Sequence, residues 1–515
     1  MSRRCILIGT FVILASFGDS LCYAQTSSPG PGNRWQPGSN SIAPIAADDQ
    51  DLGLDDQDPG TGAPDGPDAA PSPSLLIRLD QMQAQIDALR GAGSEQPGVT
   101  DPTRNLIPGE RRSTDVPRIE DLKATPTFPR VRLTGFFQAD AGWYNQDARN
   151  TATLGNIQDV MGFRRTRLAA VGDVSESVSY MLEMDFSFPG RPSFMDVWGD
   201  VHQVPILGNV RIGQWRMPFG MDELTSVREL TFIERFLGFA QAPFRQVGAG
   251  FHDTNQDKTM TWEAAGFKFP TDFFGDAQGD RGYGASGRVT RLLYYDEECN
   301  RVLHVGADYS FISPAAKGIR FANQAEFGGP FIVPQPNVNA PAGSPQALAG
   351  NLGSIPFAID TGTVPVYNYQ LFNVETGAAV GSWYAQSELR YAVLNQISGA
   401  NSVLPTAYAE TGYFLTGEKR PYNQNSGVFG RVKPIRKWGE DGGWGAVETA
   451  FRYSYADFNG HGISGNRLND CTLGLNWYLN QYSKLQFNYI HSILGGNVHG
   501  VSDFDTYAMR FQVDF

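Results

Sequence analysis

From about residue 128 to the C-terminus, apolar and polar residues alternate in short stretches that Gly, Asn, Asp and Pro interrupt. A period of two places successive side chains on opposite faces of a β-strand. The chain ends on such a stretch, which stops at a terminal phenylalanine. In it, Tyr507, Met509, Phe511, Val513 and Phe515 alternate with Thr506, Ala508, Arg510, Gln512 and Asp514.

The same alternation recurs at residues 178–186, 447–455 and 471–480. An apolar face and a polar face along each strand are typical of a transmembrane barrel. Because lipid cannot satisfy the hydrogen bonds of an open sheet edge, the sheet must close on itself. The sequence therefore predicts an all-β fold, a closed antiparallel transmembrane β-barrel over residues 128–515. A Gly-, Pro- and Asn-rich insertion at 318–378 is expected to interrupt the strands on the extracellular side.

The first residues predict export. Arg3 and Arg4 precede an apolar stretch, and Cys22-Tyr23-Ala24 is a small-x-small cleavage pattern, so residues 1–24 are interpreted as a signal peptide. Residues 25–73 are rich in Pro, Gly, Ser and Asp, a composition that predicts a disordered acidic linker.

A heptad pattern follows this linker. Leu75, Leu79, Met82, Ile86 and Leu89 recur at spacings of four and three, which predicts a short coiled-coil helix over 74–91. Two heptads are marginal alone in water, so an oligomerisation helix and an amphipathic helix lying on the barrel both stay open. Residues 92–127 are expected to form a second linker.

Charge and motifs exclude several function classes. The formal net charge of -13 argues against nucleic-acid binding. The sequence has no G-x-S-x-G, H-E-x-x-H or Walker A motif, so we expect neither an enzyme nor a cofactor. His304 and Asp308 would share a luminal face without a third ligand, so no metal site is predicted.

Six segments spread through 128–515 carry a family resemblance. They are residues 163–188, 210–235, 360–362, 413–431, 444–455 and 473–479. In this order they resemble the phosphate-selective porin O/P family. The resemblance implies a trimeric barrel of about 16 strands in the outer membrane of a Gram-negative-type bacterium. It also implies an inward-folded third extracellular loop lined with basic residues, whose position matches roughly 220–250.

The implied function is passive diffusion of small anions, such as phosphate or polyphosphate, through a water-filled channel. The expected partners are outer-membrane lipid, the permeating anions, two further copies in a homotrimer, and a periplasmic or envelope contact through residues 25–127.

Arginines on the polar strand faces and in the inward loop are the candidate anion-binding groups, because the guanidinium stays charged and holds two phosphate oxygens at once. Alternation places Arg165 and Arg167 in the lumen and points Arg164 the other way. Arg216 falls where relatives often have lysine. The full set of candidates is Arg165, Arg167, Arg211, Arg216, Arg228, Arg235, Arg245, Arg452 and Arg510.

An alternative role for these arginines stays open. Residues 200–250 hold five arginines and five acidic residues, so ordinary pairing across the lumen would also explain them. A general or sugar-permeable porin is the alternative function. Tryptophans could serve a sugar path, although a girdle at the membrane interface is the commoner placement. The tryptophans considered are Trp143, Trp198, Trp215, Trp383 and Trp477.

Overall fold

The computed structural model describes residues 127–187, 191–272, 274–277, 279, 282–327, 355–440 and 442–515. The predicted signal peptide, the acidic linker, the helix over 74–91 and, apart from Thr127, the second linker lie outside the described residues. The first strand begins at Arg132.

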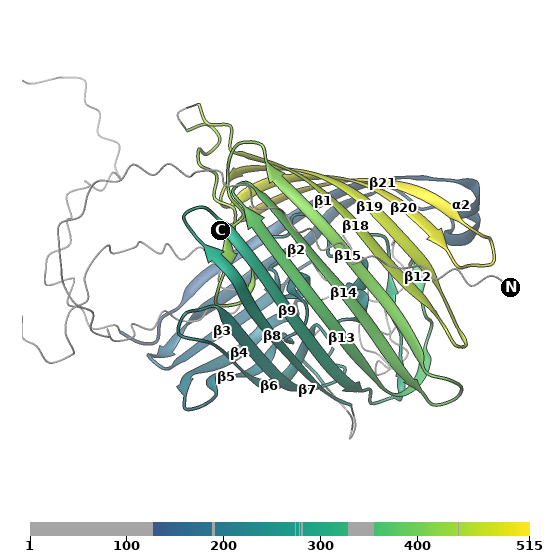
Figure 1. Cartoon of the computed structure of the whole chain (residues 1–515), viewed down its shortest axis with the longest axis horizontal. Helices are drawn as coiled ribbons and strands as arrows, with labels where there is room; N and C mark the ends of the chain where they lie inside the picture. The colour runs from purple at the N-terminus through teal and green to yellow at the C-terminus, as the bar shows by residue number, and fades with distance from the viewer. Residues whose placement is uncertain are drawn as a thin grey trace, which may run out of the picture. The chain divides into compact units, whose positions relative to one another are not determined.

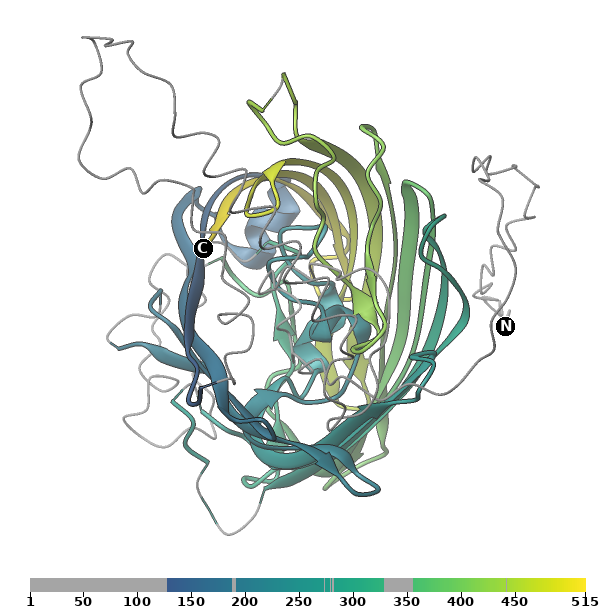
Figure 2. The same cartoon turned by 90° about the vertical axis from the view of Figure 1, so that its left-hand side faces the viewer.

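Within the described residues, sixteen long strands pair antiparallel, each with the next, and the last pairs with the first from Phe136↔Asp514 to Gln146↔Phe504. The sheet therefore closes into a barrel (Figures 1 and 2), which confirms the predicted closed antiparallel barrel and its strand number. The strands are β1 (Arg132–Gln146), β2 (Val160–Ser175), β3 (Val178–Asp185), β4 (Ser193–Val204), β5 (Gly208–Arg216), β6 (Arg245–Thr254), β7 (Met260–Lys268), β8 (Tyr283–Asp296), β9 (Arg301–Ser313), β13 (Val364–Val380), β14 (Trp383–Gln396), β15 (Ser402–Phe414), β18 (Ala446–Gly460), β19 (Ile463–Asn480), β20 (Ser483–Gly495) and β21 (Ser502–Asp514).

Shorter elements lie in the connections. They are α2 (Ala148–Leu154), α3 (Met221–Leu224), the 3₁₀ helix η3 (Leu237–Gln241), β10 (Gly318–Ile319), β11 (Ala322–Asn323), β12 (Ile359–Asp360), β16 (Tyr422–Asn423) and β17 (Val428–Phe429). Among the described residues, no helix has the length and apolar character to cross a membrane.

The two faces of the strands follow the predicted alternation. Along β21, Thr506, Arg510 and Gln512 point inward and are buried, whereas Tyr507 lies outward and is half exposed. A barrel that presents apolar side chains to lipid and polar ones to its lumen needs this arrangement.

The two ends of the barrel differ in their connections. Turns at 176–177, 381–382 and 481–482 are two residues long, whereas the other end has long connections such as 147–159 and 217–244 beside one short turn at 461–462. Short turns face the periplasm in outer-membrane barrels. The connection between β15 and β18 is the long exception at this short-turn end.

The prediction that an insertion extends over 318–378 is wrong at its C-terminal boundary. Residues 364–378 belong to β13, which pairs with β9 and β14 along its length. Its inward face carries the apolar Val366, Tyr369 and Leu371 before the polar Asn373 and Glu375, so its first half lacks the inward polar residues that mark the other strands. A strand without that contrast is easily mistaken for a loop.

Candidate functional site

The connection between β5 and β6, residues 217–244, folds into the barrel (Figure 2) and is here called the inward loop. Its Gln241 side chain donates to the carbonyl of Leu404 on β15, and its Glu223 bonds Arg390 on β14 at 2.6 Å. It occupies the position that the family resemblance assigns to a constriction loop. Arg245 opens β6 and does not belong to the loop itself.

Apolar side chains of the inward loop are buried inside the barrel. Phe232, Phe236 and Leu237 are at most 1% exposed. The Phe236 ring lies 4.5 Å from that of Tyr408 on β15. These rings pack against Tyr408 on β15 and Arg452 on β18, so the inward loop lies against this wall of the barrel.

Glu234 is the centre of the polar anchorage. Its carboxylate lies 3.0 Å from Arg164, 2.9 Å from Arg165 and 2.9 Å from Arg510, which also bonds Asp140 on β1. Burial acts to raise the pKa of Glu234, but the three guanidinium groups outweigh it and hold the pKa well below its usual range. The loop is thus pinned to β2 and β21 by a carboxylate that stays ionised.

The expectation that Arg164 points away from the lumen is wrong. The register of β1 and β2 shifts between Gln138 and Ala139, so that Arg165 faces Gln138 and Phe163 faces Ala139. The extra residue of this bulge is Arg164, whose buried side chain reaches Glu234 beside that of Arg165. A β-bulge breaks strict alternation and re-aims a side chain.

Two candidate arginines brace the backbone of the inward loop. Nη1 of Arg216 donates to the carbonyls of Glu223 and Thr225 at 2.7 and 2.8 Å. Nη2 of Arg235 donates to the same two carbonyls at 3.1 and 2.5 Å. Carbonyls at the end of a helical turn need such donors when they are buried.

A second connection enters the lumen from the short-turn end. Residues 420–431, here called the inner hairpin, carry β16 and β17. Arg288 on β8 donates to the carbonyls of Ser426 and Gly427 at 2.8 Å each. Arg431 bonds Glu229 of the inward loop at 2.8 Å. The two inward connections therefore meet inside the barrel.

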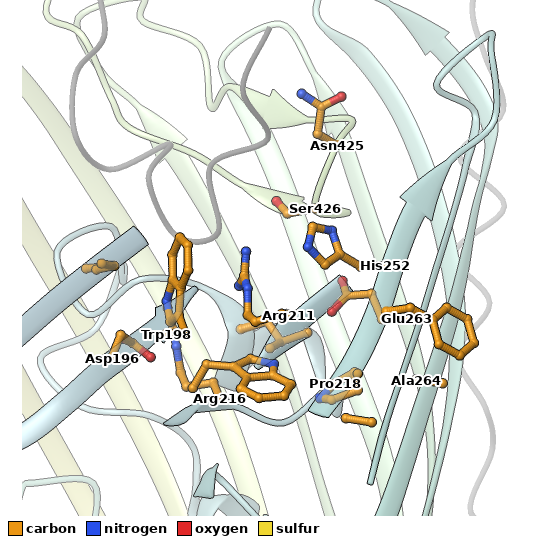
Figure 3. A pocket seen from close by; sticks show the side chains of 16 residues that line it. Asp196, Trp198, Arg211, Arg216, Pro218, His252, Glu263, Ala264, Asn425 and Ser426 are labelled. Atoms are coloured by element: carbon orange, nitrogen blue, oxygen red, sulfur yellow. The ribbon is translucent and has the colours of Figure 1, made fainter. Parts of the chain in front are cut away.

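Two cavities lie along the wall formed by β1–β7. The larger, about 70 Å³, contains Trp198 and Trp215 and is here called the aromatic cavity (Figure 3). The smaller, about 10 Å³, is here called the arginine cavity. Both are lined by Met181, Asp196 and Arg216, so they adjoin. Together they are the candidate passage among the described residues.

The passage separates the nine candidate arginines into two groups. Five line a cavity: Arg167, Arg211, Arg216, Arg228 and Arg245. The other four, Arg165, Arg235, Arg452 and Arg510, line neither of these cavities. Arg452, for example, is 1% exposed and bonds Glu326 at 2.7 Å. Arg165, Arg452 and Arg510 of this second group are held in ion pairs, and Arg235 donates to backbone carbonyls of the inward loop.

Arginines that line the passage also form ion pairs with carboxylates. Arg167 contacts Glu183 and Asp185, and Arg245 contacts Asp196. Even so, the lining of the two cavities holds five arginines and three carboxylates, Glu183, Asp196 and Glu263. The lining residues alone therefore carry a positive formal charge, although Asp200 and Asp185 pair with Arg211 and Arg167 just behind them.

Several lining residues were not among the candidates. Asp196 and Trp198 share the inward face of β4 with Asp200, which pairs with Arg211, and Glu263 faces the same lumen from β7. Trp198 and Trp215 are 5% and 7% exposed and line the cavity, so the girdle interpretation is wrong for these two tryptophans. The strict alternation of Asp196, Trp198 and Asp200 is the sequence signal that could have identified these inward-facing residues.

Comparisons with known proteins give a family match. A family model described as "Phosphate-selective porin O and P" matches residues 131–515. Porin O of Pseudomonas aeruginosa is 25% identical over 411 residues, which cover 75% of this chain and 88% of that protein. An uncharacterized protein of Caulobacter vibrioides is 25% identical over 445 residues, covering 81% of this chain and 82% of its own length.

Solved structures of barrels resemble the chain more distantly. An anion-selective porin from Comamonas acidovorans aligns with a TM-score of 0.43 at 12% identity, covering 75% of this chain and 99% of its own. OmpT, an outer membrane protein of Vibrio cholerae, aligns with a TM-score of 0.44 at 8% identity, covering 75% and 97%.

Proposed function

Because the chain belongs to the phosphate-selective porin O and P family, we propose that it is a porin for passive diffusion of small anions, phosphate among them. Family and fold make it an outer-membrane channel rather than an enzyme. What is proposed is the preference for anions and the role of the arginine-lined passage in it.

One observation carries this proposal: arginines outnumber carboxylates, five to three, in the lining of the two cavities. Charged rings along a narrow, partly desolvated pore select ions of opposite sign. Salt screens charges weakly at such short distances but strongly beyond about 10 Å. The distant negative charges of the chain therefore act on a permeating ion less than the groups along its path do.

Phosphate recognition is the finer part of the proposal. The arginine cavity, at about 10 Å³, has room for about one water molecule. A permeating oxyanion would have to exchange hydration for guanidinium contacts there and displace these side chains as it passed. Arg228 and Arg245 line this cavity beside Arg167 and supply donors whose planar geometry fits a tetrahedral oxyanion.

A second candidate function is a porin permeable to sugars without phosphate selectivity. Trp198 and Trp215 in the aromatic cavity favour it, because indole rings can contact the apolar faces of sugar rings. Anion selectivity requires positive groups along the passage, whereas sugar permeation does not.

Assembly is also part of the proposal. We expect three copies to form a trimer and residues 25–127 to contact the periplasm or envelope. Chemical cross-linking of membranes, followed by electrophoresis without heating, should show a trimer band that a deletion of 25–127 leaves intact.

Reversal potentials in a planar bilayer test the central proposal. With a KCl gradient across the membrane, the reversal potential of the wild-type channel should have the sign expected for a pore that prefers chloride. Added phosphate should then reduce the chloride current. A cation-preferring reversal would contradict the proposal, and reversal at zero with no phosphate effect would favour the sugar-permeable alternative.

A further inference from the structure

The aromatic cavity is built from two walls of different chemistry. Trp198 and Trp215 form an apolar side, and the guanidinium of Arg211 lies 4.0 Å from the Trp198 ring. Figure 3 shows Arg211 directed into the cavity between Trp198 and His252, with Glu263 beside His252. Arg211 is thus stacked on one face of Trp198, and the polar edge continues from its guanidinium to His252 and Glu263.

The polar edge keeps hydrogen-bonding capacity available. Nε and Nη2 of Arg211 bond Asp200 at 3.1 and 2.5 Å, whereas Nη1 has no hydrogen-bond partner among the described residues. The His252 ring uses Nε2 for Asp200 at 2.9 Å, and its Nδ1 has no partner in the same part of the chain.

Glu263 completes this edge. It is the cross-strand neighbour of His252, and its nearest recorded cation is Arg288 at 4.0 Å. Within the described ranges its carboxylate accepts no hydrogen bond, and its side chain is 22% exposed. The edge therefore offers a guanidinium donor, a carboxylate acceptor and an imidazole nitrogen.

This mixture discriminates between solutes. Bare phosphate would meet Arg211 but would also face Glu263 and Asp196, which repel it, and would leave both indole rings without a contact. A simple aromatic acid would use the rings and Arg211 but would leave Glu263 without a donor. A hydroxyl group both donates and accepts, so a ring carrying several hydroxyls satisfies both the carboxylate and the imidazole.

Size and charge narrow the class further. The enclosed part of the cavity, about 70 Å³, is smaller than the roughly 150 Å³ that hold one benzene ring, so it takes part of one ring and the rest of the solute extends into the open lumen. The adjoining arginine cavity adds Arg167, Arg228 and Arg245 beyond the shared Arg216. An anionic substituent on the ring would be drawn toward that side.

We propose that the aromatic cavity is a binding site for monosaccharide phosphates, with the sugar ring against Trp198 and Trp215, its hydroxyls at Glu263 and His252, and its phosphate at the arginines. The inference rests on the proposed anion channel and names the solute class that this channel favours.

Block of the chloride current tests this site. Inorganic phosphate, glucose, benzoate and glucose 6-phosphate are added in turn, and the concentration that halves the current is measured for each. Glucose 6-phosphate should act at a concentration roughly five-fold or more below that of phosphate, since each ring contact contributes a modest stacking energy. Glucose and benzoate should both be weaker than glucose 6-phosphate.

Variants identify the cavity as the origin of this preference. Trp198→Leu and Trp215→Leu should each lower the ratio of the phosphate to the glucose 6-phosphate half-block concentration by roughly two- to ten-fold. Glu263→Gln, at a partly exposed side chain, should lower the same ratio even if both tryptophan variants fail to fold. Trp143→Leu, at a tryptophan on the outer face that is 44% exposed, is the matched control and should leave the ratio unchanged.

The outcomes separate the two proposals. Phosphate block with a wild-type ratio near one overturns the monosaccharide-phosphate site and leaves the anion channel standing. A ratio that none of the three cavity variants changes, or benzoate block as strong as that of glucose 6-phosphate, also overturns the site. Cation-preferring reversal with no phosphate block overturns the anion channel itself.

Discussion

Nε of Arg431 lies 2.8 Å from Oε1 of Glu229, although the two residues come from connections at opposite ends of the barrel. Arg431 also bonds Asp514 on β21 at 2.7 Å, and Arg420 donates to the Glu229 carbonyl. The inner hairpin thus holds the inward loop against the wall. A passage beside this loop depends on a contact made from the short-turn end.

Glu229→Gln should loosen the inward loop. The change replaces a charge-assisted bond by a neutral one at a buried site, at a cost of about 2 kcal/mol, while Arg431 keeps Asp514. We expect a lower unfolding temperature and greater open-channel current noise, measured by circular dichroism and by single-channel recording. Glu440→Gln is the control, since its pair with Lys437 is exposed and should contribute little. Equal noise in both variants would contradict the coupling.

Glu234→Gln should destabilise the barrel more strongly. Arg164, Arg165 and Arg510 would be left together without their shared carboxylate, and breaking such buried pairs costs about 3–5 kcal/mol. Thermal unfolding of wild type and variant, compared at one pH and lipid composition, measures the difference. A loss below about 1 kcal/mol would mean that the three arginines find other partners.

The contribution of Glu234 should also depend on pH in a defined direction. Its folded-state pKa lies well below the ordinary value of 4.5, so the stabilisation is complete above that value and is lost only as the pH falls through the lower folded-state pKa. The unfolding-temperature difference between wild type and Glu234→Gln should be constant from about pH 8 to about pH 5.5 and should narrow in stronger acid. Narrowing already between pH 7 and pH 6 would contradict the assigned direction.

Gly220→Ala tests the start of the inward loop. Gly220 has a φ of 77°, and an added Cβ would lie 2.5 Å from Oε2 of Glu223 and 2.9 Å from Nη2 of Arg390. Gly381→Ala is a matched control, because Gly381 has a φ of 58° and open space around the added atom. Both variants should lose stability from backbone strain, and Gly220→Ala should lose at least about 1 kcal/mol more from the clash. Equal losses of stability in the two variants would show that the Glu223–Arg390 pair moves aside at no cost in free energy.

Much of the barrel was predictable because period-2 alternation is a local property of each strand. It placed Arg167, Arg211 and Arg510 on the inward face. It failed at Arg164, where a bulge that depends on pairing with β1 inserts one residue. It also failed for 364–378, where the first half of β13 has apolar side chains such as Tyr369 and Leu371 on its inward face.

The division of the arginines could not be read from the sequence. Which guanidinium groups line the passage depends on the path of the inward loop and of the inner hairpin, and their link joins Glu229 to Arg431 across 202 residues. The segment 420–431 is polar and rich in turn residues, like an ordinary surface loop. Only the folded barrel brings its arginines inside.

The selectivity of Arg228→Gln, compared with that of Arg291→Gln, tests the arginine-lined passage most directly. Both changes remove one positive charge, but Arg228 lines the arginine cavity, whereas Arg291 is exposed on the outer face of β8. Reversal potentials in a KCl gradient should show a chloride preference for wild type and Arg291→Gln, and a clear shift toward cations for Arg228→Gln. Equal reversal potentials in the two variants, or a cation preference already in wild type, would contradict the account.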